Sequence, residues 1–274
     1  MTILNTAEPN FLSQLVVCTR CKSDLEQKNE HLVCSQCEYS APIIDGIPRF
    51  IELTSGDLDD QNPIEHRQKY EHNYQSAERA QGYNDSFVTI KRDKKRTHRE
   101  LHILNTLLGM VNSTESLLDI PCGGGRLSAP LASKTKNLIK MDASLEQVKL
   151  AMAVQTHTTP RFGASASALA LPLKDKSIDG ILNARLSHHL PSMAERAELL
   201  DELLRVARKF VIFSFTDINS TNTLYKKIRG KKPDPVTMSV SEIEAACSRN
   251  SAKLTKIMTV FRLGSRHRFA LIEL

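Results

Sequence analysis

Two sets of residues in this chain have types and spacings that can do chemistry, and the first is a set of cysteines. They form two pairs, Cys18-x-x-Cys21 and Cys34-x-x-Cys37, with 12 residues between the pairs. Two such pairs form two turns that close a tetrahedral zinc site, because thiolates are common ligands of structural zinc. Four cysteines leave no open coordination position, so the predicted Zn²⁺ is structural and supplies much of the folding energy of a short ribbon.

The second set is a glycine-rich turn and two acids. An apolar run ends at Asp119, and three glycines, Gly123 to Gly125, follow it closely. This order predicts a buried strand, a turn whose backbone can approach a ligand, and a helix, because glycine has no Cβ to obstruct. Seventeen residues after Gly125 a second apolar run ends at Asp142. In a βαβ unit this acid falls at the carboxyl end of the neighbouring strand, where it can bind a ribose diol.

The elements that must position these residues alternate between strand and helix. Such alternation predicts a parallel sheet that is covered by helices on both faces. A capping-box pattern, Ser239 with Glu242, indicates the start of a late helix. The expected strands are 116–120, 137–141, 161–166, 178–183 and 209–216; the expected helices are 63–80, 96–110, 125–134, 145–155 and 193–208; and a hairpin of the apolar runs 253–261 and 267–274 ends the chain.

The glycine turn, Asp142 and a third segment, Leu171-Pro172 followed by Ser177-Ile178-Asp179, together resemble the class I S-adenosylmethionine-dependent methyltransferases. The resemblance covers about residues 95–274. It implies an α/β, Rossmann-like sheet of seven strands and S-adenosyl-L-methionine as the cofactor. The later His-His-Leu makes the layout most similar to the methyltransferases of quinone biosynthesis.

The cysteine pairs carry a resemblance of their own. They are followed by Asp45-Gly46-Ile47-Pro48, a tail similar to that of the small zinc-ribbon proteins that activate methyltransferases. The resemblance implies a zinc-ribbon module at residues 1–53 and allows a protein partner there. Residues 54–94 are then a linker and lid helix, and residues 95–274 the methyltransferase domain. Cys122 and Cys247 have no partner by spacing and are interpreted as packing residues.

The family resemblance assigns roles to the cofactor-binding residues. Asp119 would receive the methionyl ammonium, Gly123 and Gly125 would let the backbone pass close to the cofactor, and Asp142 would accept both ribose hydroxyls. Pro121 stands where the family has its first glycine, and it removes a backbone donor.

At the position near adenine the chain departs from the family. Many members carry an acid there, whereas this chain has Ser167 followed by Ala168. The serine oxygen and the Ala168 backbone N–H are the groups expected to meet the ring. Tyr74 and Tyr83 are the candidates for a lid over the cofactor, although aromatic residues that dock the helix to the core are the favoured interpretation.

The segment after the fourth strand holds the candidate catalytic residues. Asn183 and Arg185 are expected to meet the methionyl carboxylate or the methyl acceptor. His188 and His189 are candidate general bases at neutral pH. The alternative is structural, because in the family at least one histidine at this point supports the loop.

Three functions remain open from the sequence. The first is methylation of a small molecule, a lipid or an envelope precursor. The second is methylation of rRNA or tRNA, with the zinc ribbon and two basic clusters, Lys91–Arg99 and Lys226–Lys232, following the phosphates. The third is a non-catalytic scaffold that binds the cofactor. The basic clusters are equally compatible with a solvated surface.

Composition sets the remaining bounds. The chain has 274 residues, 41% of them hydrophobic and 25% charged, with a formal net charge of +6. These values are ordinary for a globular protein. No apolar run approaches the roughly 20 residues that cross a bilayer, and residues 1–10 do not resemble a secretory signal. A cytoplasmic location is therefore expected.

Overall fold

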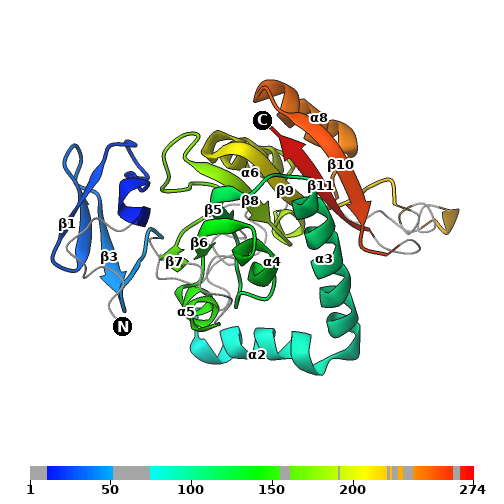
Figure 1. The fold of residues 1–274 in the computed structure, drawn as a ribbon, viewed down its shortest axis with the longest axis horizontal. Coiled ribbons are helices and arrows are strands. Elements are labelled where there is room, and N and C mark those ends of the chain that lie inside the picture. The colour runs from blue at the N-terminus through cyan, green and yellow to red at the C-terminus, as the bar shows by residue number, and fades with distance from the viewer. Residues whose placement is uncertain are drawn as a thin grey trace.

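A computed structural model describes residues 11–51, 75–154, 161–190, 192–220, 223, 228–230, 237–261 and 266–274. The described chain contains a small sheet and a large one (Figure 1). The small sheet is antiparallel, in the order β1-β2-β3-β4, and follows the 3-10 helix η1 (Phe11–Gln14). Its strands are β1 (Leu25–Lys28), β2 (His31–Cys34), β3 (Ser40–Ile44) and β4 (Ile47–Pro48).

The large sheet has seven strands in the order β10-β11-β9-β8-β5-β6-β7. The five strands from β5 to β9 are parallel, and β11 runs antiparallel to both β9 and β10. This mixed, Rossmann-like sheet confirms the predicted fold class, and the predicted strand ends agree to within two residues for the parallel strands. The strands are β5 (Thr114–Asp119), β6 (Thr135–Asp142), β7 (Arg161–Ser165), β8 (Ile178–Asn183), β9 (Ala207–Thr216), β10 (Lys253–Thr259) and β11 (His267–Glu273).

The helices differ more from the predictions than the strands do. The expected helix 63–80 lies mostly outside the described residues, and a helix begins only at Ala77, where the Ser76 side chain caps it by accepting a hydrogen bond from the Arg79 N–H. The helix expected at 96–110 begins earlier, at Lys91. The bounds are α2 (Ala77–Thr89), α3 (Lys91–Gly109), α4 (Ser128–Ala132), α5 (Leu145–Ala153), α6 (Met193–Val206) and α8 (Val240–Arg249), with the 3-10 turn η2 (Ser187–His189).

Two further predictions about helices have different outcomes. The helix expected at 125–134 shrinks to α4, because the glycine turn continues to Leu127. The capping box of Ser239 and Glu242 is present at the start of α8. No helix in the described ranges is long and apolar enough to cross a membrane. The cytoplasmic location stays a prediction.

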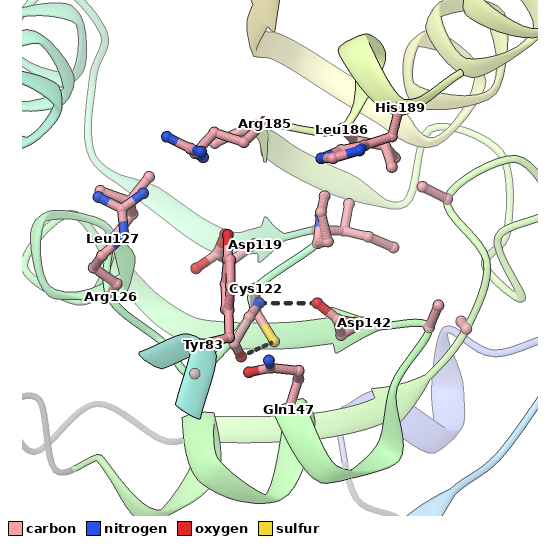
Figure 2. Close-up of a pocket in the computed structure, with 18 of the residues that line it drawn as sticks. Tyr83, Asp119, Cys122, Arg126, Leu127, Asp142, Gln147, Arg185, Leu186 and His189 are labelled. Carbon is pink, nitrogen blue, oxygen red and sulfur yellow. Dashed lines mark hydrogen bonds between the residues drawn. The ribbon is translucent and has the colours of Figure 1, made fainter. Parts of the chain in front are cut away.

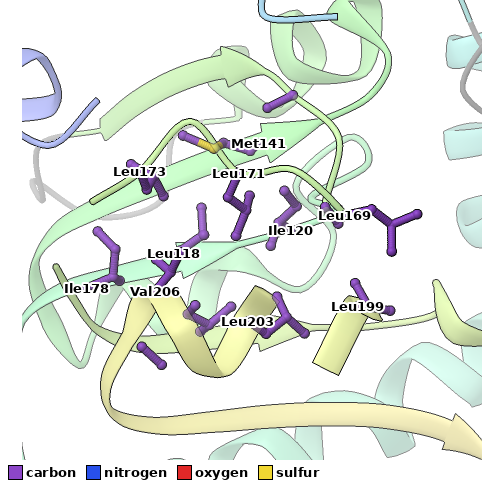
Figure 3. Close-up of a cluster of buried hydrophobic side chains, with 14 of the residues drawn as sticks. Leu118, Ile120, Met141, Leu169, Leu171, Leu173, Ile178, Leu199, Leu203 and Val206 are labelled. Carbon is purple, nitrogen blue, oxygen red and sulfur yellow. The ribbon is translucent and has the colours of Figure 1, made fainter. Parts of the chain in front are cut away.

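Helices cover both faces of the large sheet because successive strand residues point to opposite faces. In β5, Leu117 belongs to the cluster under α3 and α4, whereas Leu118 belongs to the cluster under α6 and α8. Both side chains are fully buried. Figure 3 shows the second cluster, in which Leu203 and Val206 of α6 lie below Leu118. This packing fixes the strand ends that carry the site.

The small sheet packs on the edge strand β7 (Figure 1). The Phe50 N–H donates to the Ser165 carbonyl at 2.8 Å, and Arg49 forms a parallel bridge with Ser165. The Val17 N–H donates to the Pro172 carbonyl at 3.0 Å. An edge strand that would otherwise leave its backbone groups exposed is thereby covered, and the loop 166–173 is held from its outer side.

Candidate active site

The carboxyl ends of β5, β6 and β8 open into one cavity (Figure 2). Ligands of open parallel sheets bind at this edge. The empty space measures about 1280 Å³, part of it open to solvent. The polar, glycine and aromatic residues that line it are Tyr83, Asn84, Phe87, Asp119, Gly123, Gly124, Arg126, Asp142, Gln147, Ser167, Arg185, His188 and His189.

Asp142 lies at the end of β6, as predicted, and is fixed by the backbone. Its Oδ2 accepts a hydrogen bond from the Gly123 N–H at 2.9 Å, and its Oδ1 accepts one from the Ser144 N–H at 2.9 Å. The Ala143 N–H is a third backbone donor to this carboxylate, and burial raises the pKa of Asp142 to about 6. A carboxylate has about four acceptor sites, so acceptor capacity remains for a ligand hydroxyl.

Asp119 ends β5 and is 1% exposed. Its Oδ2 accepts a hydrogen bond from the Ser128 hydroxyl at 2.7 Å. Burial is the main reason that the pKa of Asp119 rises to about 6, although the Ser128 hydrogen bond lowers it. A buried carboxyl of this kind favours a cationic ligand, because a nearby positive charge offsets the cost of ionising it.

The glycine turn between β5 and α4 brings the backbone close to the cavity. Gly123 and Gly125 have positive φ values of 50° and 82°, which L side chains rarely adopt. Gly123 lines the cavity, whereas Gly125 packs against α5, where an added Cβ would lie 3.2 Å from the Cα of Ala151. Gly124, for which no role was predicted, also lies against a neighbour. An added Cβ there would lie 2.3 Å from the Oδ1 of Asn84.

Helix α2 forms one wall of the cavity and connects α3 with α5 (Figure 1). Asn84 accepts a hydrogen bond from the Gly124 N–H at 3.2 Å and donates one to the Oε1 of Gln147 at 2.8 Å. Tyr83 lines the cavity and packs edge-on against Phe87, with 5.1 Å between the ring centroids. Tyr74, the other expected lid residue, lies outside the described residues. Asn84, Phe87 and Gln147 were not predicted, because no local pattern marks them.

The adenine-side candidates lie on the loop that the small sheet holds. Ser167 and Ala168 both line the cavity, opposite α2. The Ser167 hydroxyl oxygen accepts a hydrogen bond from the Leu169 N–H at 3.4 Å. Their placement fits contact with a ligand that Asp142 also holds.

Asn183, which ends β8, and Arg185, two residues beyond it, have different positions. Asn183 is fully buried, and its Nδ2 donates to the Ile120 carbonyl at 2.8 Å. It is not among the residues that line the cavity, and its buried Oδ1 makes no hydrogen bond to a described residue, so its contact with a ligand stays a prediction. Arg185 does line the cavity, and its backbone N–H donates to the Ser214 hydroxyl at 2.6 Å.

Both candidate histidines line the cavity, and they lie side by side with 4.1 Å between their ring centroids. His188 also contacts His267 edge-on, at 5.4 Å. Burial, assisted by neighbouring positive charges, lowers the pKa of His188 to about 2 and that of His267 to about 4. His188 is therefore neutral at physiological pH and holds a proton poorly.

The four predicted cysteine ligands come together between η1 and the first strands of the small sheet. The Sγ atoms of Cys18 and Cys37 are 3.6 Å apart, and those of Cys21 and Cys34 are 3.4 Å apart. All four sulfurs lie within 4.8 Å of one another. A tetrahedral zinc with Zn–S bonds of about 2.3 Å places its sulfurs about 3.8 Å apart, so the cluster is consistent with structural zinc. Cys122 and Cys247 are buried away from it, as predicted.

Comparison with known proteins agrees with this geometry. The methyltransferase domain family model matches residues 118–215, which run from β5 into β9 and include the glycine turn and the histidine pair. No curated protein sequence matches the chain.

Several solved structures share the fold. Magnesium protoporphyrin IX methyltransferase from Synechocystis, with bound S-adenosylmethionine, has a TM-score of 0.56 and 15% identity, covering 80% of this chain and 99% of that chain. A methyltransferase from Leishmania major has a TM-score of 0.56 and 12% identity, covering 80% and 87%. A chain from a complex between a methyltransferase activator and a methyltransferase of Haloferax volcanii has a TM-score of 0.51 and 16% identity, covering 69% and 96%.

The family match places the glycine turn and the β5 to β9 core in a known domain, and the structures show the same sheet. Residues 118–215 therefore belong to an S-adenosylmethionine-dependent methyltransferase domain with the class I fold, and the chain before it carries a small sheet whose four-cysteine cluster is consistent with a zinc ribbon.

Proposed function

We propose that this methyltransferase acts on a small-molecule acceptor that binds beside the carboxyl end of β8. The observation that carries the proposal is the cover that helix α2 places over part of the site. Helix α2 lies over the glycine turn through Asn84, and the aromatic rings of Tyr83 and Phe87 line the space beneath. A cavity covered in this way suits a compact acceptor, because burial of most of a ligand's surface is typical of small-molecule sites.

The residues of the β5 and β6 side are proposed to hold the cofactor. Asp142 keeps acceptor capacity for the ribose beside its three backbone donors, and Asp119 offers its remaining oxygen to the methionyl ammonium. Ser167 and Ala168 lie where the adenine ring is expected, on the outer side of Asp142. When bound, S-adenosyl-L-methionine supplies an activated methyl group on a sulfonium.

The protein's own part in methyl transfer is then mainly positioning. The residues of the β8 side orient an acceptor atom, and closure by α2 excludes water. The structure supports His188 as a residue that lines the site and not as a general base, because its pKa is about 2. His189 remains the candidate base for an acceptor that is protonated at neutral pH.

The four cysteines are proposed to bind one Zn²⁺ whose role is structural. In the described part of residues 1–53, the buried Cys18, Cys34 and Tyr39 belong to one apolar cluster with residues of the catalytic domain such as Leu171 and Leu173. The proposed division into a ribbon at 1–53, a linker and lid at 54–94 and a catalytic domain at 95–274 is supported by the two separate sheets. The connection 52–74 lies outside the described residues.

RNA methylation is the second candidate, favoured by one observation. The first turns of α3 expose Lys91, Arg92, Lys94, Lys95 and Arg99. Such a row of cations can follow phosphates. Most of the other cluster, Lys226–Lys232, lies outside the described residues.

One experiment separates the two candidates. Purified zinc-loaded protein is incubated with S-adenosylmethionine and either a metabolite extract or total RNA, and release of S-adenosylhomocysteine is measured. Release with the metabolite fraction is expected. Release with RNA only, lost after Lys94→Glu and Lys95→Glu, would instead support the RNA candidate.

A further inference from the structure

The cavity has two chemically different sides. Its β5 and β6 side carries the acids Asp119 and Asp142, whereas its β8 side carries arginine (Figure 2). Figure 2 shows the Arg185 side chain across the cavity from Asp142 and Gln147, extended toward Arg126. The proposed cofactor contacts account for the acids but leave the arginine side without a role.

Arg185 is held in an unusual backbone conformation. Its φ is +65°, in the left-handed region that a residue other than glycine rarely adopts. The Ser214 hydroxyl fixes this conformation by accepting the Arg185 N–H at 2.6 Å. Strain of this kind persists where the surrounding structure fixes it, and it occurs often at ligand sites.

The positive charge of Arg185 has only a shared partner among the described residues. Its Nη1 lies 3.5 Å from the Oε1 of Glu100, a carboxylate that is 1% exposed. The same Glu100 accepts a closer hydrogen bond, 2.7 Å, from Arg126. Neither the Nε nor the Nη1 of Arg185 makes a hydrogen bond to any described residue.

The other charged groups near Arg185 do not fully neutralise its positive charge. Arg96 faces Arg185 from α3 and forms an ion pair with Asp93 at 3.4 Å. The guanidinium groups of Arg96, Arg126 and Arg185 share the carboxylates of Asp93 and Glu100, and Arg126 also interacts with Asp119, the acid proposed for the cofactor ammonium. The Arg185 side chain is 19% exposed, but its Nε and Nη1 atoms are buried without a hydrogen bond to a described residue. Because such unpaired polar atoms are costly, this side of the cavity suits an anion.

The position of Arg185 in the sheet indicates which ligand brings the anion. The strand order β6-β5-β8 places the ribose acid, the ammonium acid and Arg185 in one row. A cofactor held by the first two presents its reactive end toward β8, where Arg185 and the histidine pair stand. Phe87 adds an aromatic face there, 5.7 Å from the Arg185 guanidinium and 4.3 Å from that of Arg126.

We propose that Arg185 binds an anionic group of the methyl acceptor, so that the acceptor is a small molecule with a carboxylate or phosphate on an apolar, ring-sized body. Arg185 is thus a specificity-determining residue, and Glu100 is a positioning residue that holds Arg126 and Arg185 together. A guanidinium can bind either anion through two parallel hydrogen bonds. The proposal rests on the proposed cofactor site.

The test uses protein saturated with S-adenosylhomocysteine and four probes: benzoate and phenyl phosphate, with benzamide and benzyl alcohol as uncharged counterparts. Binding is measured by calorimetry for the unsubstituted protein, Arg185→Gln and Arg185→Lys. Arg249→Gln is the matched control, because Arg249 pairs with Asp201 on the surface. At least one anion should bind about tenfold more tightly than its counterpart. Arg185→Gln should abolish that preference, and Arg185→Lys should keep part of it.

Affinity for S-adenosylhomocysteine separates the outcomes. The proposal expects Arg185→Gln to change it less than about threefold. A loss of about tenfold or more, without any preference for the anions, would assign the guanidinium to the cofactor carboxylate and overturn the proposal. The absence of any preference in the unsubstituted protein would overturn it as well. Failure of the unsubstituted protein to bind S-adenosylhomocysteine would contradict the proposed function instead.

Discussion

The contact between the small sheet and β7 differs from the cavity at the carboxyl ends of β5, β6 and β8. At the first, backbone groups such as Phe50 N–H and Ser165 C=O are paired, and the side chains between them are mostly apolar. At the second, charged groups such as the buried Asp119 and the half-buried Arg185 keep unused hydrogen-bonding capacity. Polar groups whose hydrogen bonds are all made within the protein stabilise the fold, whereas groups with unsatisfied hydrogen-bonding capacity indicate where a ligand binds.

The two regions nevertheless meet in the loop 166–173. Its inner side lines the cavity at Ser167 and Ala168, and its outer side bonds to Val17. Changes in the four-cysteine cluster should therefore act mainly on stability and, through this loop, weakly on cofactor binding. Substitutions in the cavity should change mainly the affinity for the cofactor.

The largest expected effect follows from removal of a cysteine ligand. Cys34→Ser should eliminate stoichiometric zinc and unfold the small sheet, because binding of structural zinc supplies about 10 kcal/mol or more in small ribbons. Metal content and thermal unfolding measure the result. Cys247→Ser, outside the cluster, should retain the metal. Unchanged metal content in Cys34→Ser would exclude the zinc site.

The next effect concerns the lid. Gly124→Ala should weaken S-adenosylmethionine binding about thirtyfold, because the new Cβ displaces the Asn84 amide and costs two hydrogen bonds of about 1 kcal/mol each. Gly82→Ala is the control in α2, since its Cβ would meet nothing within 4 Å. It should stabilise the helix by about 1 kcal/mol. Equal binding by both variants would contradict the lid role of Asn84.

A third effect is the pH dependence of cofactor binding. The pKa values of Asp119 and Asp142 are raised to about 6. Both acids must be ionised to bind the cofactor, Asp119 its ammonium and Asp142 its ribose hydroxyls. The affinity for S-adenosylmethionine is therefore highest above pH 6 and should fall about tenfold from pH 7 to pH 5 for each acid involved. Without ligand the sign is opposite: the stabilising contribution of the protonated acids is lost as the pH rises through about 6. Binding titrations at several pH values should show the first trend, and thermal unfolding without ligand at the same pH values should show the second. An affinity for S-adenosylmethionine that does not change with pH would contradict the role of the two acids.

The smallest effect is expected at His188. His188→Asn should lower the rate of methyl transfer less than about tenfold and leave the pH–rate profile in place, because a histidine whose pKa is about 2 cannot act as a base that holds a proton at neutral pH. The profile is measured once an acceptor is found. Disappearance of a limb near pH 6 to 7 would show instead that His188 titrates in catalysis.

The predicted parts of the molecule are those with strong local signals. The strand ends at Asp119 and Asp142 follow from continuous apolar runs, and the cysteine cluster follows from spacing alone. Both signals depend on residues close together in the sequence, so the fold class and the acid side of the cavity could be predicted.

The parts that were missed depend on contacts between distant segments. Asn84 is a polar residue in a mostly polar helix, and only its hydrogen bonds to Gly124 and Gln147 give it a role. Glu100 lies just after a basic cluster that suggested a solvated surface, yet it is buried between two arginines. Only the structure shows that the Nδ2 of Asn183 donates to the backbone of the neighbouring turn while its Oδ1 stays without a hydrogen bond to a described residue.

Calorimetric titration of the zinc-loaded protein with S-adenosylmethionine, repeated with Asp142→Ala, tests directly whether the cavity binds the cofactor through this acid. We expect the unsubstituted protein to bind and the variant to lose about a hundredfold in affinity, because two hydrogen bonds to a charged group are removed. Absence of binding by the unsubstituted protein, or equal binding by both, would contradict binding through Asp142.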